Sequence, residues 1–240
     1  MVPFKIVGLL VFTALTMVKG PLVNNGKGLA WGKVMKRDID IKQVLTDMNV
    51  MKSQDAGSSV EDRKSTNFVR NGRVYILGDF DESIAKYVVP DLNEMISDAS
   101  GQKDVTIPFY INSCGGESDQ LQSILSLITI AKSMGINIMT FVVGNAYSCG
   151  SLLAIHGDVR LMARGARHMM HMGEIGSSSK TYEQLKRNNK DAKDFFDDTV
   201  KMYVNCTKMT DKQVREILKD DMYWMDAKQC LKLGLCDTIV

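Results

Sequence analysis

The sequence has little of what marks several common protein classes. Its 240 residues include only 4 prolines, 2 tryptophans and 3 histidines. The 30 basic and 28 acidic residues give a formal net charge of +2. No long block of like charges forms a nucleic-acid-binding arm. We therefore expect no nucleic-acid partner.

Cysteine is also scarce, and its pattern excludes the usual metal sites. The five cysteines have spacings that match no paired metal-ligand pattern, namely Cys114, Cys149, Cys206, Cys230 and Cys236. The odd count favours free thiols in a reducing compartment, so we expect a cytoplasmic protein. A phosphate-binding G-x-x-x-x-G-K-[ST] loop is absent from the chain. We expect neither a metal nor a cofactor.

The N-terminal part of the sequence leaves two interpretations open. Ile6–Val18 is an apolar run flanked by Lys5 and Lys19. It is shorter than the ~20 residues of a membrane span and resembles a signal-peptide core, but no small-x-small cleavage pattern follows it. The run is either a signal or anchor segment, or a disposable leader or buried helix. Residues 1–70 are predicted to be a mostly irregular N-terminal extension, and residues 71–240 the folded domain.

Regular alternation of strand and helix patterns begins at Arg73. Pro90 should kink the first helix or restart it, and Gly144 should end the third strand. The alternation predicts an α/β fold with a mainly parallel sheet and right-handed crossovers. The predicted strands are Arg73–Leu77, Val105–Ile111, Ile136–Val143, Val159–Met162 and Arg167–His171. The predicted helices are Ser83–Ile96, Gln120–Met134, Ser151–Ile155, Tyr182–Tyr203, Val214–Leu218 and Ala227–Leu233.

Two strand-to-helix turns could carry chemistry. In the first, Gly115–Gly116 would let the backbone approach a ligand and direct N–H groups at it, although a plain tight turn would look the same. In the second, Ser148 opens a helix after a buried strand, where a developing anion is stabilised by the helix dipole. The N–H of Cys149 could donate to that anion. The alternative is that Ser148 is an ordinary helix N-cap.

A nucleophilic serine needs a base, and histidine is the usual one. His156 lies at a helix end, where a contact with the helix C-terminus is the expected role. His168 and His171 share a short strand-like segment, and their spacing places them on opposite faces of it. At most one of them should face Ser148.

Taken together, these segments resemble the Clp protease proteolytic subunit family. Arg73–Gly78 resembles the opening strand of that family, and Tyr110–Gly116 (YINSCGG) resembles its Y-I-N-S-P-G-G turn. Gly144–Gly150 (GNAYSCG) resembles the G-x-A-x-S-M-G turn, and Arg167–His171 (RHMMH) resembles the R-x-M-x-H strand. The tail from Trp224 to Asp237 resembles the closing block of the family.

The resemblance implies a role for each of these residues. Ser148 would be the nucleophile and His171 its general base, with the backbone N–H groups of Gly116 and Cys149 forming the oxyanion hole.

The acid of the triad would come from the Lys219–Trp224 turn, because a gapless alignment puts Leu218 at the usual position of the aspartate. Asp220 is the preferred candidate and Asp221 the alternative. This acid would hold the tautomer of His171.

The resemblance also implies architecture and partners. The fold would be a Clp/crotonase-type (ClpP-like) α/β core with a protruding helix–strand handle over Gly173–Tyr203. Through such handles the family builds a homo-oligomer of stacked rings, served by an ATP-driven AAA+ unfoldase that supplies protein substrates. The implied function is a serine endopeptidase.

Three rivals remain: a signal-peptide-peptidase-like hydrolase with a lysine base, a crotonase-like acyl-CoA enzyme, and a catalytically silent ring or assembly subunit.

Overall fold

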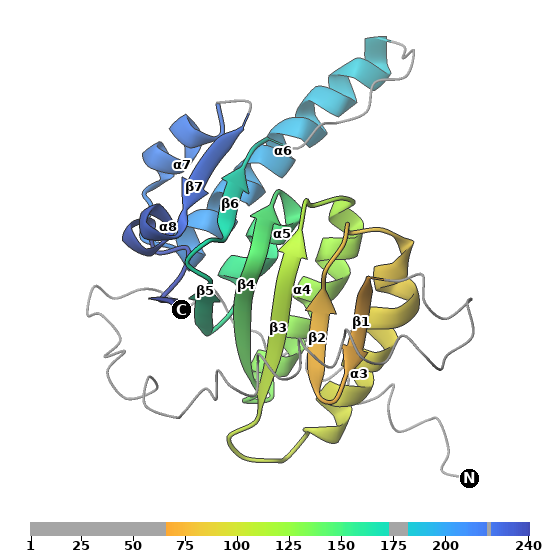
Figure 1. The fold of residues 1–240 in the computed structure, drawn as a ribbon. Coiled ribbons are helices and arrows are strands. Elements are labelled where there is room, and N and C mark those ends of the chain that lie inside the picture. Colours follow the sequence, from red (N-terminus) through yellow and green to blue (C-terminus); the bar gives the residue numbers. More distant parts are fainter. Residues whose placement is uncertain (1–65, 173–181, 220–221) are drawn as a thin grey trace. The chain divides into compact units, whose positions relative to one another are not determined.

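The computed structural model describes residues 66–172, 182–219 and 222–240, without the side chains of residues 182–189 (Figure 1). The Ile6–Val18 run, nearly all of the extension assigned to residues 1–70, the Asp220–Asp221 pair and the start of the expected handle lie outside the described residues.

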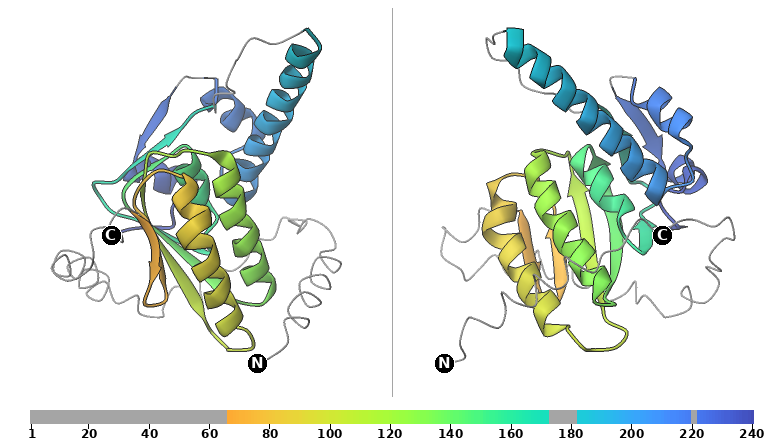
Figure 2. Two further views of the ribbon diagram at one scale, coloured as in Figure 1. Left: turned by 90° about the vertical axis from the view of Figure 1, so that its right-hand side faces the viewer. Right: turned by 180° about the vertical axis from the view of Figure 1, so that it is seen from behind.

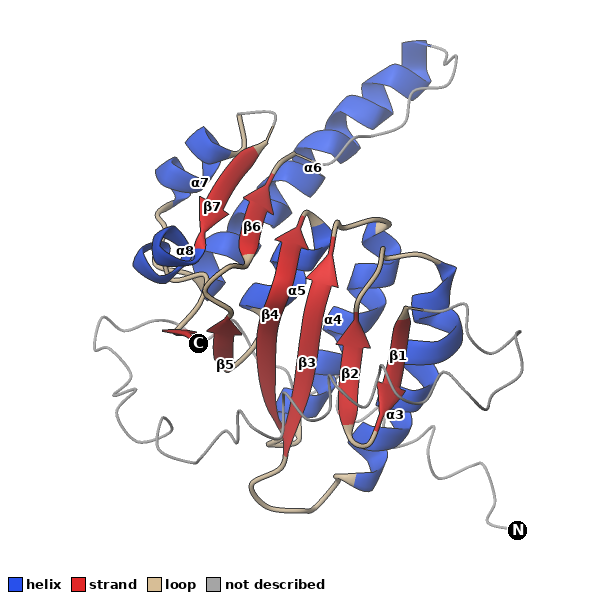
Figure 3. Cartoon of the chain, in the orientation of Figure 1, coloured by secondary structure: helices blue, strands red, loops and turns tan. Residues whose placement is uncertain are grey.

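Within these described ranges, eight strands form one sheet (Figures 1 and 3). The strands are β1 (Asn67–Arg70), β2 (Arg73–Ile76), β3 (Thr106–Ser113), β4 (Asn137–Tyr147), β5 (Val159–Met162), β6 (Arg167–Met170), β7 (Tyr223–Asp226) and β8 (Thr238–Ile239). Their order is β1–β2–β3–β4–β5–β8, with β6 pairing to β4 and β7 to β6. The β1–β2 and β6–β7 pairings are antiparallel, and the others are parallel. The predicted α/β class with a mainly parallel sheet is confirmed.

Helices α3, α4 and α5 lie side by side on one face of this sheet, and α6 extends away from the body (Figure 2). The helices are η1 (Ile84–Val88), α3 (Val89–Asp98), α4 (Ser118–Ser133), α5 (Cys149–Ile155), α6 (Tyr182–Cys206), α7 (Asp211–Ile217) and α8 (Ala227–Leu233). The expected break at Pro90 is present, since the π-helical turn η1 gives way to α3 there. None of the helices in the described ranges combines the length and apolar character needed to cross a membrane.

The predicted start of regular structure at Arg73 is wrong, because β1 already begins at Asn67. An Asn71–Gly72 turn, with φ of 49° and 71°, joins β1 to β2 as a hairpin. Asn67 is buried and binds the next loop through three hydrogen bonds, to the Asp79 carbonyl at 2.7 Å, the Ser83 hydroxyl at 3.0 Å and the Gly78 N–H at 3.1 Å. The short strands β7 and β8 were also missed.

The prediction that Gly144 ends the third strand is wrong as well. β4 continues to Tyr147, and its second half leaves β5 and pairs with β6. A register shift between β3 and β4 accompanies this change of partner, and Asn112 fills it by accepting a hydrogen bond from the Asn145 N–H at 2.9 Å. A Cβ atom on Gly144 would lie 2.4 Å from the Asn112 side-chain oxygen. Glycine therefore permits a bend within the strand.

The two faces of the sheet differ in composition. The face under α3, α4 and α5 holds the aliphatic core, including Val74, Ile111 and Ile138. On the opposite face, a row of stacked and edge-on rings crosses four neighbouring strands, with centroids 4.7, 5.1 and 6.0 Å apart. The rings of this row belong to Phe68, Tyr75, Tyr110 and Phe141.

One buried arginine joins the C-terminal elements. The guanidinium of Arg160 on β5 makes a bidentate pair with Asp237, at 2.6 and 3.0 Å. It also donates to the carbonyls of Cys206 and Gly234, at the ends of α6 and α8. Because a planar guanidinium satisfies several acceptors at once, Arg160 ties β5, α6, α8 and the segment before β8 together.

Candidate active site

Ser148 occupies the sharp turn between β4 and α5. Its backbone has φ 53° and ψ −119°, a region that residues other than glycine rarely adopt. The Ser148 N–H donates to the Met169 carbonyl at 3.1 Å, and the Ser148 carbonyl accepts from the Leu152 N–H at 3.1 Å. Its side chain makes no capping hydrogen bond. The ordinary N-cap interpretation is therefore wrong.

The Gly115–Gly116 segment packs directly against this turn. A Cβ atom on Gly115 would lie 2.5 Å from the Ser148 Cβ, and one on Gly116 would lie 2.5 Å from the Phe80 carbonyl oxygen. Both glycines have positive φ, 105° and 137°. Phe80 pairs with Gly116 as a parallel bridge. The bridge hydrogen bonds use the Gly115 carbonyl and the Glu117 N–H, at 2.7 and 2.8 Å. The segment therefore needs glycine at both positions.

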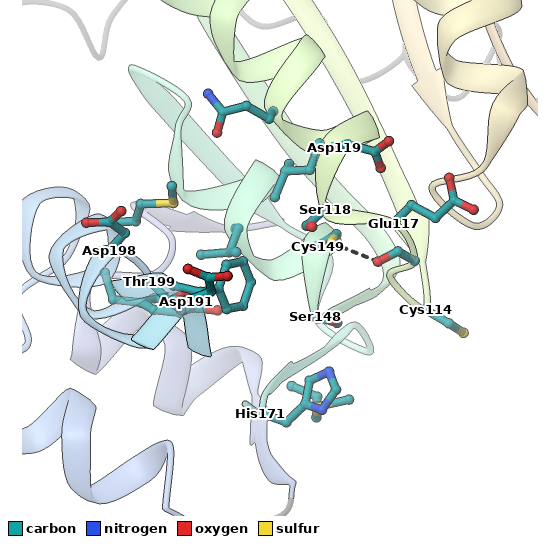
Figure 4. Close-up of a pocket in the computed structure, with 18 residues that line it drawn as sticks. Cys114, Glu117, Ser118, Asp119, Ser148, Cys149, His171, Asp191, Asp198 and Thr199 are labelled. Carbon is teal, nitrogen blue, oxygen red and sulfur yellow. Dashed lines mark hydrogen bonds between the residues drawn. The ribbon is translucent and has the colours of Figure 1, made fainter. Parts of the chain in front are cut away.

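Two backbone donors lie next to Ser148. Outside the helices and strands of the described residues, no backbone–backbone hydrogen bond uses the N–H of Gly116 or that of Cys149. The carbonyl of Gly116 accepts from the Cys149 thiol at 3.2 Å, which links the two residues (Figure 4). Burial raises the pKa of that thiol to about 11, so it stays a hydrogen-bond donor near neutral pH. Cys149 is thus not a thiolate nucleophile.

The parallel pairing of β4 with β6 brings His171 to the same end of the sheet. Tyr147 pairs with Met169, so the residues that follow each strand, Ser148 and His171, both lie at the carboxyl edge. Both side chains line one pocket (Figure 4). No hydrogen bond joins the Ser148 hydroxyl to the His171 ring in this structure. In unliganded enzymes such bonds are often long and tighten only with substrate.

The other two histidines serve different purposes. His168 is fully buried on the opposite side of β6, both of its ring nitrogens lack hydrogen-bond partners, and burial lowers its pKa to about 3. His156 ends α5, where its ring Nδ1–H donates to the Leu152 carbonyl at 2.6 Å. Burial lowers the pKa of His156 as well. Of the three, His171 alone shares a pocket with Ser148.

The pocket has a volume of about 930 Å³ and an apolar floor with an acidic rim. The floor is formed by Leu121, Leu152, Phe195, Met202 and Tyr203. The rim carries the carboxylates of Glu117, Asp119, Asp191 and Asp198. Sequence reasoning missed the contribution of α6, although Asp191, Phe195, Asp198 and Met202 have the spacing of one helical face.

The predicted acid, Asp220, and its alternative, Asp221, lie outside the described residues. The antiparallel pairing places Met170, which precedes His171, opposite Tyr223, the first residue of β7. The first residue of β7 therefore lies beside the end of β6, where His171 follows. Leu218, which a gapless alignment would put at the acid position, is buried in the core.

Neither the cysteines nor the other potential ligands of the described residues form a metal site. All five cysteines are free thiols. Among the described side chains, no group of three or more histidines, cysteines and carboxylates could hold a metal ion.

These features define an α/β protein with a strained serine turn, adjacent backbone N–H groups and a histidine at the end of the neighbouring strand. A model of the Clp protease family matches residues 55–240. ATP-dependent Clp protease proteolytic subunits from Streptococcus mutans and Lactococcus lactis are 29% and 26% identical to the chain, and both alignments cover 70% of it. They cover 83% and 82% of those relatives.

A solved structure of a ClpP1 variant from Listeria monocytogenes superposes with a TM-score of 0.59, over 70% of the chain and 90% of its own length, at 15% identity. That likeness confirms the predicted fold. The chain belongs to the Clp protease family and is a serine-type peptidase of that family. The family match favours this class over the signal-peptide-peptidase-like and crotonase-like alternatives.

Proposed function

We propose that the chain is a serine endopeptidase that cleaves unfolded polypeptides with Ser148, His171 and Asp220, as the proteolytic subunit of a compartmentalised Clp-type protease. The single observation that carries this proposal is the strained, uncapped Ser148 turn, which lies beside the backbone N–H groups of Gly116 and Cys149 and shares a pocket with His171.

The chemistry follows from these positions. His171 takes the proton of Ser148 while the serine oxygen attacks the scissile carbonyl carbon. The N–H groups of Gly116 and Cys149 stabilise the resulting oxyanion. His171 then protonates the leaving amine, which breaks the peptide bond and leaves an acyl group on Ser148. Water then attacks the acyl carbon while His171 takes a proton from it. His171 returns that proton to the Ser148 oxygen as the acyl bond breaks, which releases the acid product.

The acid is proposed to orient His171 and stabilise its protonated form. We expect Asp220→Asn to lower turnover strongly, by about 10⁴ as in a related triad, and Asp221→Asn to lower it little. Steady-state kinetics of both variants and of the double variant checks this assignment. Full activity of the double variant would show that a serine–histidine dyad, or another carboxylate, does the work.

The substrates and partners are part of the same proposal. The apolar floor of the pocket suits uncharged side chains of unfolded proteins, and its acidic rim disfavours acidic ones. The relatives carry the name ATP-dependent, whereas this chain has no phosphate-binding loop of its own. We infer a homo-oligomer of stacked rings, joined through the handle that contains α6, and a separate ATP-driven unfoldase. The free thiols support a cytoplasmic location.

Fluorophosphonate labelling followed by mapping of the modified residue tests the proposal. Ser148→Ala should abolish labelling and lower turnover by about 10⁴ or more, with the fold intact. Ser118→Ala is the matched control, because Ser118 also lines the pocket but has no strained turn. His171→Ala should abolish labelling too, while His168→Ala should change stability more than turnover.

The silent-subunit alternative makes the opposite prediction for the wild-type protein. No labelling of the wild type would favour a subunit that only assembles, whereas equal labelling of wild type and Ser148→Ala would show that another residue reacts.

A further inference from the structure

A pair of aromatic rings lies just outside the pocket, in a row that crosses three strands. Tyr147 on β4 pairs with Met169 on β6, and Met169 pairs with Trp224 on β7. Paired residues project to the same face of a sheet. The rings of Tyr147 and Trp224 meet edge to face, with centroids 4.7 Å apart and an interplanar angle of 79°. We call these two rings and Met169 the aromatic ledge.

The ledge exposes apolar surface that a folded domain would ordinarily cover. Trp224 is 50% exposed and the adjacent Met222 is 56% exposed, whereas Met169 is only 7% exposed. A large exposed aromatic next to a site is a common mark of a binding surface. Trp224 has no role in the core of the domain, since it is absent from the packed apolar cluster.

The ledge is also held in place. The Tyr147 hydroxyl donates to the Asn145 side-chain oxygen at 2.8 Å, and the Asn145 N–H donates to the Asn112 side chain at 2.9 Å. Partial burial raises the pKa of the Tyr147 phenol, so the phenol remains a donor. The ring thus has little rotational freedom to lose when a ligand binds.

The ledge and the pocket flank the reacting atoms. Met169 belongs to the ledge and also lines the pocket with Ser148 and His171, whereas neither Tyr147 nor Trp224 lines it. Tyr147 directly precedes Ser148 in the chain. A polypeptide that places one side chain in the pocket and its scissile bond at Ser148 would therefore pass on toward the ledge.

We propose that the aromatic ledge is a second substrate subsite for an unfolded polypeptide. It binds an aromatic or branched aliphatic side chain from the other side of the scissile bond than the side chain held in the pocket. The proposal rests on the peptidase function of Ser148. It makes Tyr147 and Trp224 determinants of specificity and not catalytic residues.

The test compares two internally quenched peptides that differ only in one residue beyond the scissile bond, Phe or Ser. In the full-length protein, Trp224→Ala should lower kcat/KM for the Phe peptide by about tenfold, the order expected for loss of an aromatic contact. The Ser peptide should change less than about twofold by the same reasoning. Tyr87→Ala is the matched control, because Tyr87 is exposed on η1 and makes no contact with the ledge.

Fluorophosphonate labelling separates the ledge from the catalytic groups. The small probe does not reach beyond Ser148, so its labelling rate should be unchanged in Trp224→Ala. Equal losses for both peptides, or a parallel loss of labelling, would overturn the proposal. A change of oligomeric state on gel filtration together with these losses would make the ledge a contact between copies of the chain.

A binding measurement on a variant without Ser148 tests the ledge separately from the proposed peptidase function. The chain has 2 tryptophans, so a Trp31→Phe, Ser148→Ala variant leaves Trp224 as the only reporter. Its fluorescence should change when the Phe peptide is added and not when the Ser peptide is added. If the wild type cleaves nothing but this response persists, the peptidase function fails and the ledge stands. A response to both peptides, or to neither, contradicts the ledge.

Discussion

The backbone of Ser148 is held in a strained conformation. Its positive φ costs about 1–3 kcal/mol for a residue with a Cβ atom. The Met169 and Leu152 hydrogen bonds hold it there. The same geometry turns the hydroxyl away from the capping position and toward the pocket.

Gly116 is the residue at which a single methyl group should damage the site most. In Gly116→Ala the new Cβ would meet the Phe80 backbone at 2.5 Å, so the segment must shift and carry its N–H away from Ser148. We expect turnover to fall by about 10²–10³, the usual cost of losing an oxyanion donor. Gly101→Ala is the control, since Gly101 has a φ of 77° but open space around it. Similar turnover in both variants would remove Gly116 from the oxyanion hole.

His168 should make the fold sensitive to acid. Its pKa is lowered to about 3 by burial, against 6.5 in the unfolded chain. The folded form therefore excludes a proton that the unfolded form accepts. The contribution of neutral His168 to the free energy of unfolding is fully present above pH 6.5. We expect it to be lost as the pH falls from there toward 3, with a loss of about 2 kcal/mol at pH 5. Denaturant titrations between pH 7.5 and 5 measure this loss.

The variant His168→Leu should flatten that pH dependence, because no buried imidazole remains to be protonated. His156→Asn is the comparison variant: burial lowers the pKa of His156 in the same direction but less than that of His168, so this variant should flatten the pH dependence less. A pH profile unchanged in His168→Leu would show that other groups cause the acid sensitivity.

At the scale of elements, β4 connects the parallel sheet to the strand that carries the residues before His171. Its first half completes the parallel sheet with β5, and its second half pairs with β6 and so sets Ser148 beside His171. The bend at Gly144 separates the two halves. A strand that stopped there, as the sequence pattern suggested, would leave Ser148 and His171 on unconnected segments.

A second element-scale link joins α5 to α6. The hydroxyls of Ser151 and Tyr203 are hydrogen-bonded at 2.6 Å, and both residues are buried. Burial raises the pKa of Tyr203, which keeps it protonated. We expect Tyr203→Phe or Ser151→Ala to lower the free energy of unfolding by about 1–3 kcal/mol, because each leaves one buried hydroxyl without a partner.

The double variant should lose less than the sum of the single losses, since no hydroxyl is then left unpaired. Chemical unfolding of the four proteins of this cycle measures the coupling, and turnover shows whether α6 also positions the Ser148 turn. Additive losses would mean that the hydrogen bond contributes nothing of its own.

At the scale of the whole molecule, the folded unit should function without the first part of the chain. Residues from Ser65 onward form a compact unit, so a shortened protein beginning at Ser65 should be soluble and react with the fluorophosphonate. It must keep Asn67, whose buried amide fixes the loop at Gly78. Labelling and light scattering of the shortened protein check this. Aggregation would show that the folded unit depends on the removed residues.

Much of this protein could be predicted from short-range pattern. Alternation of strand and helix periods gave the α/β class, and the residues around Ser148 and His171 gave the family, because local backbone preferences and reactive side chains are encoded within a few residues. The spacing of His168 and His171 indicated that one of them at most faces the serine. The roles of Gly116 and Cys149 as oxyanion donors come from the resemblance to the family and remain predictions.

Other features depended on which segments meet in space. The continuation of β4 past Gly144 is decided by its pairing with β6 and by Asn112 from β3, and a pattern along one strand carries no information about its partners. The pocket floor from α6, the Ser151–Tyr203 bond and the aromatic ledge each join residues far apart in the chain. The sequence alone determined the fold class, most of the elements and the family, because these depend on short-range pattern. Tertiary pairing decided which side chains surround Ser148 and His171.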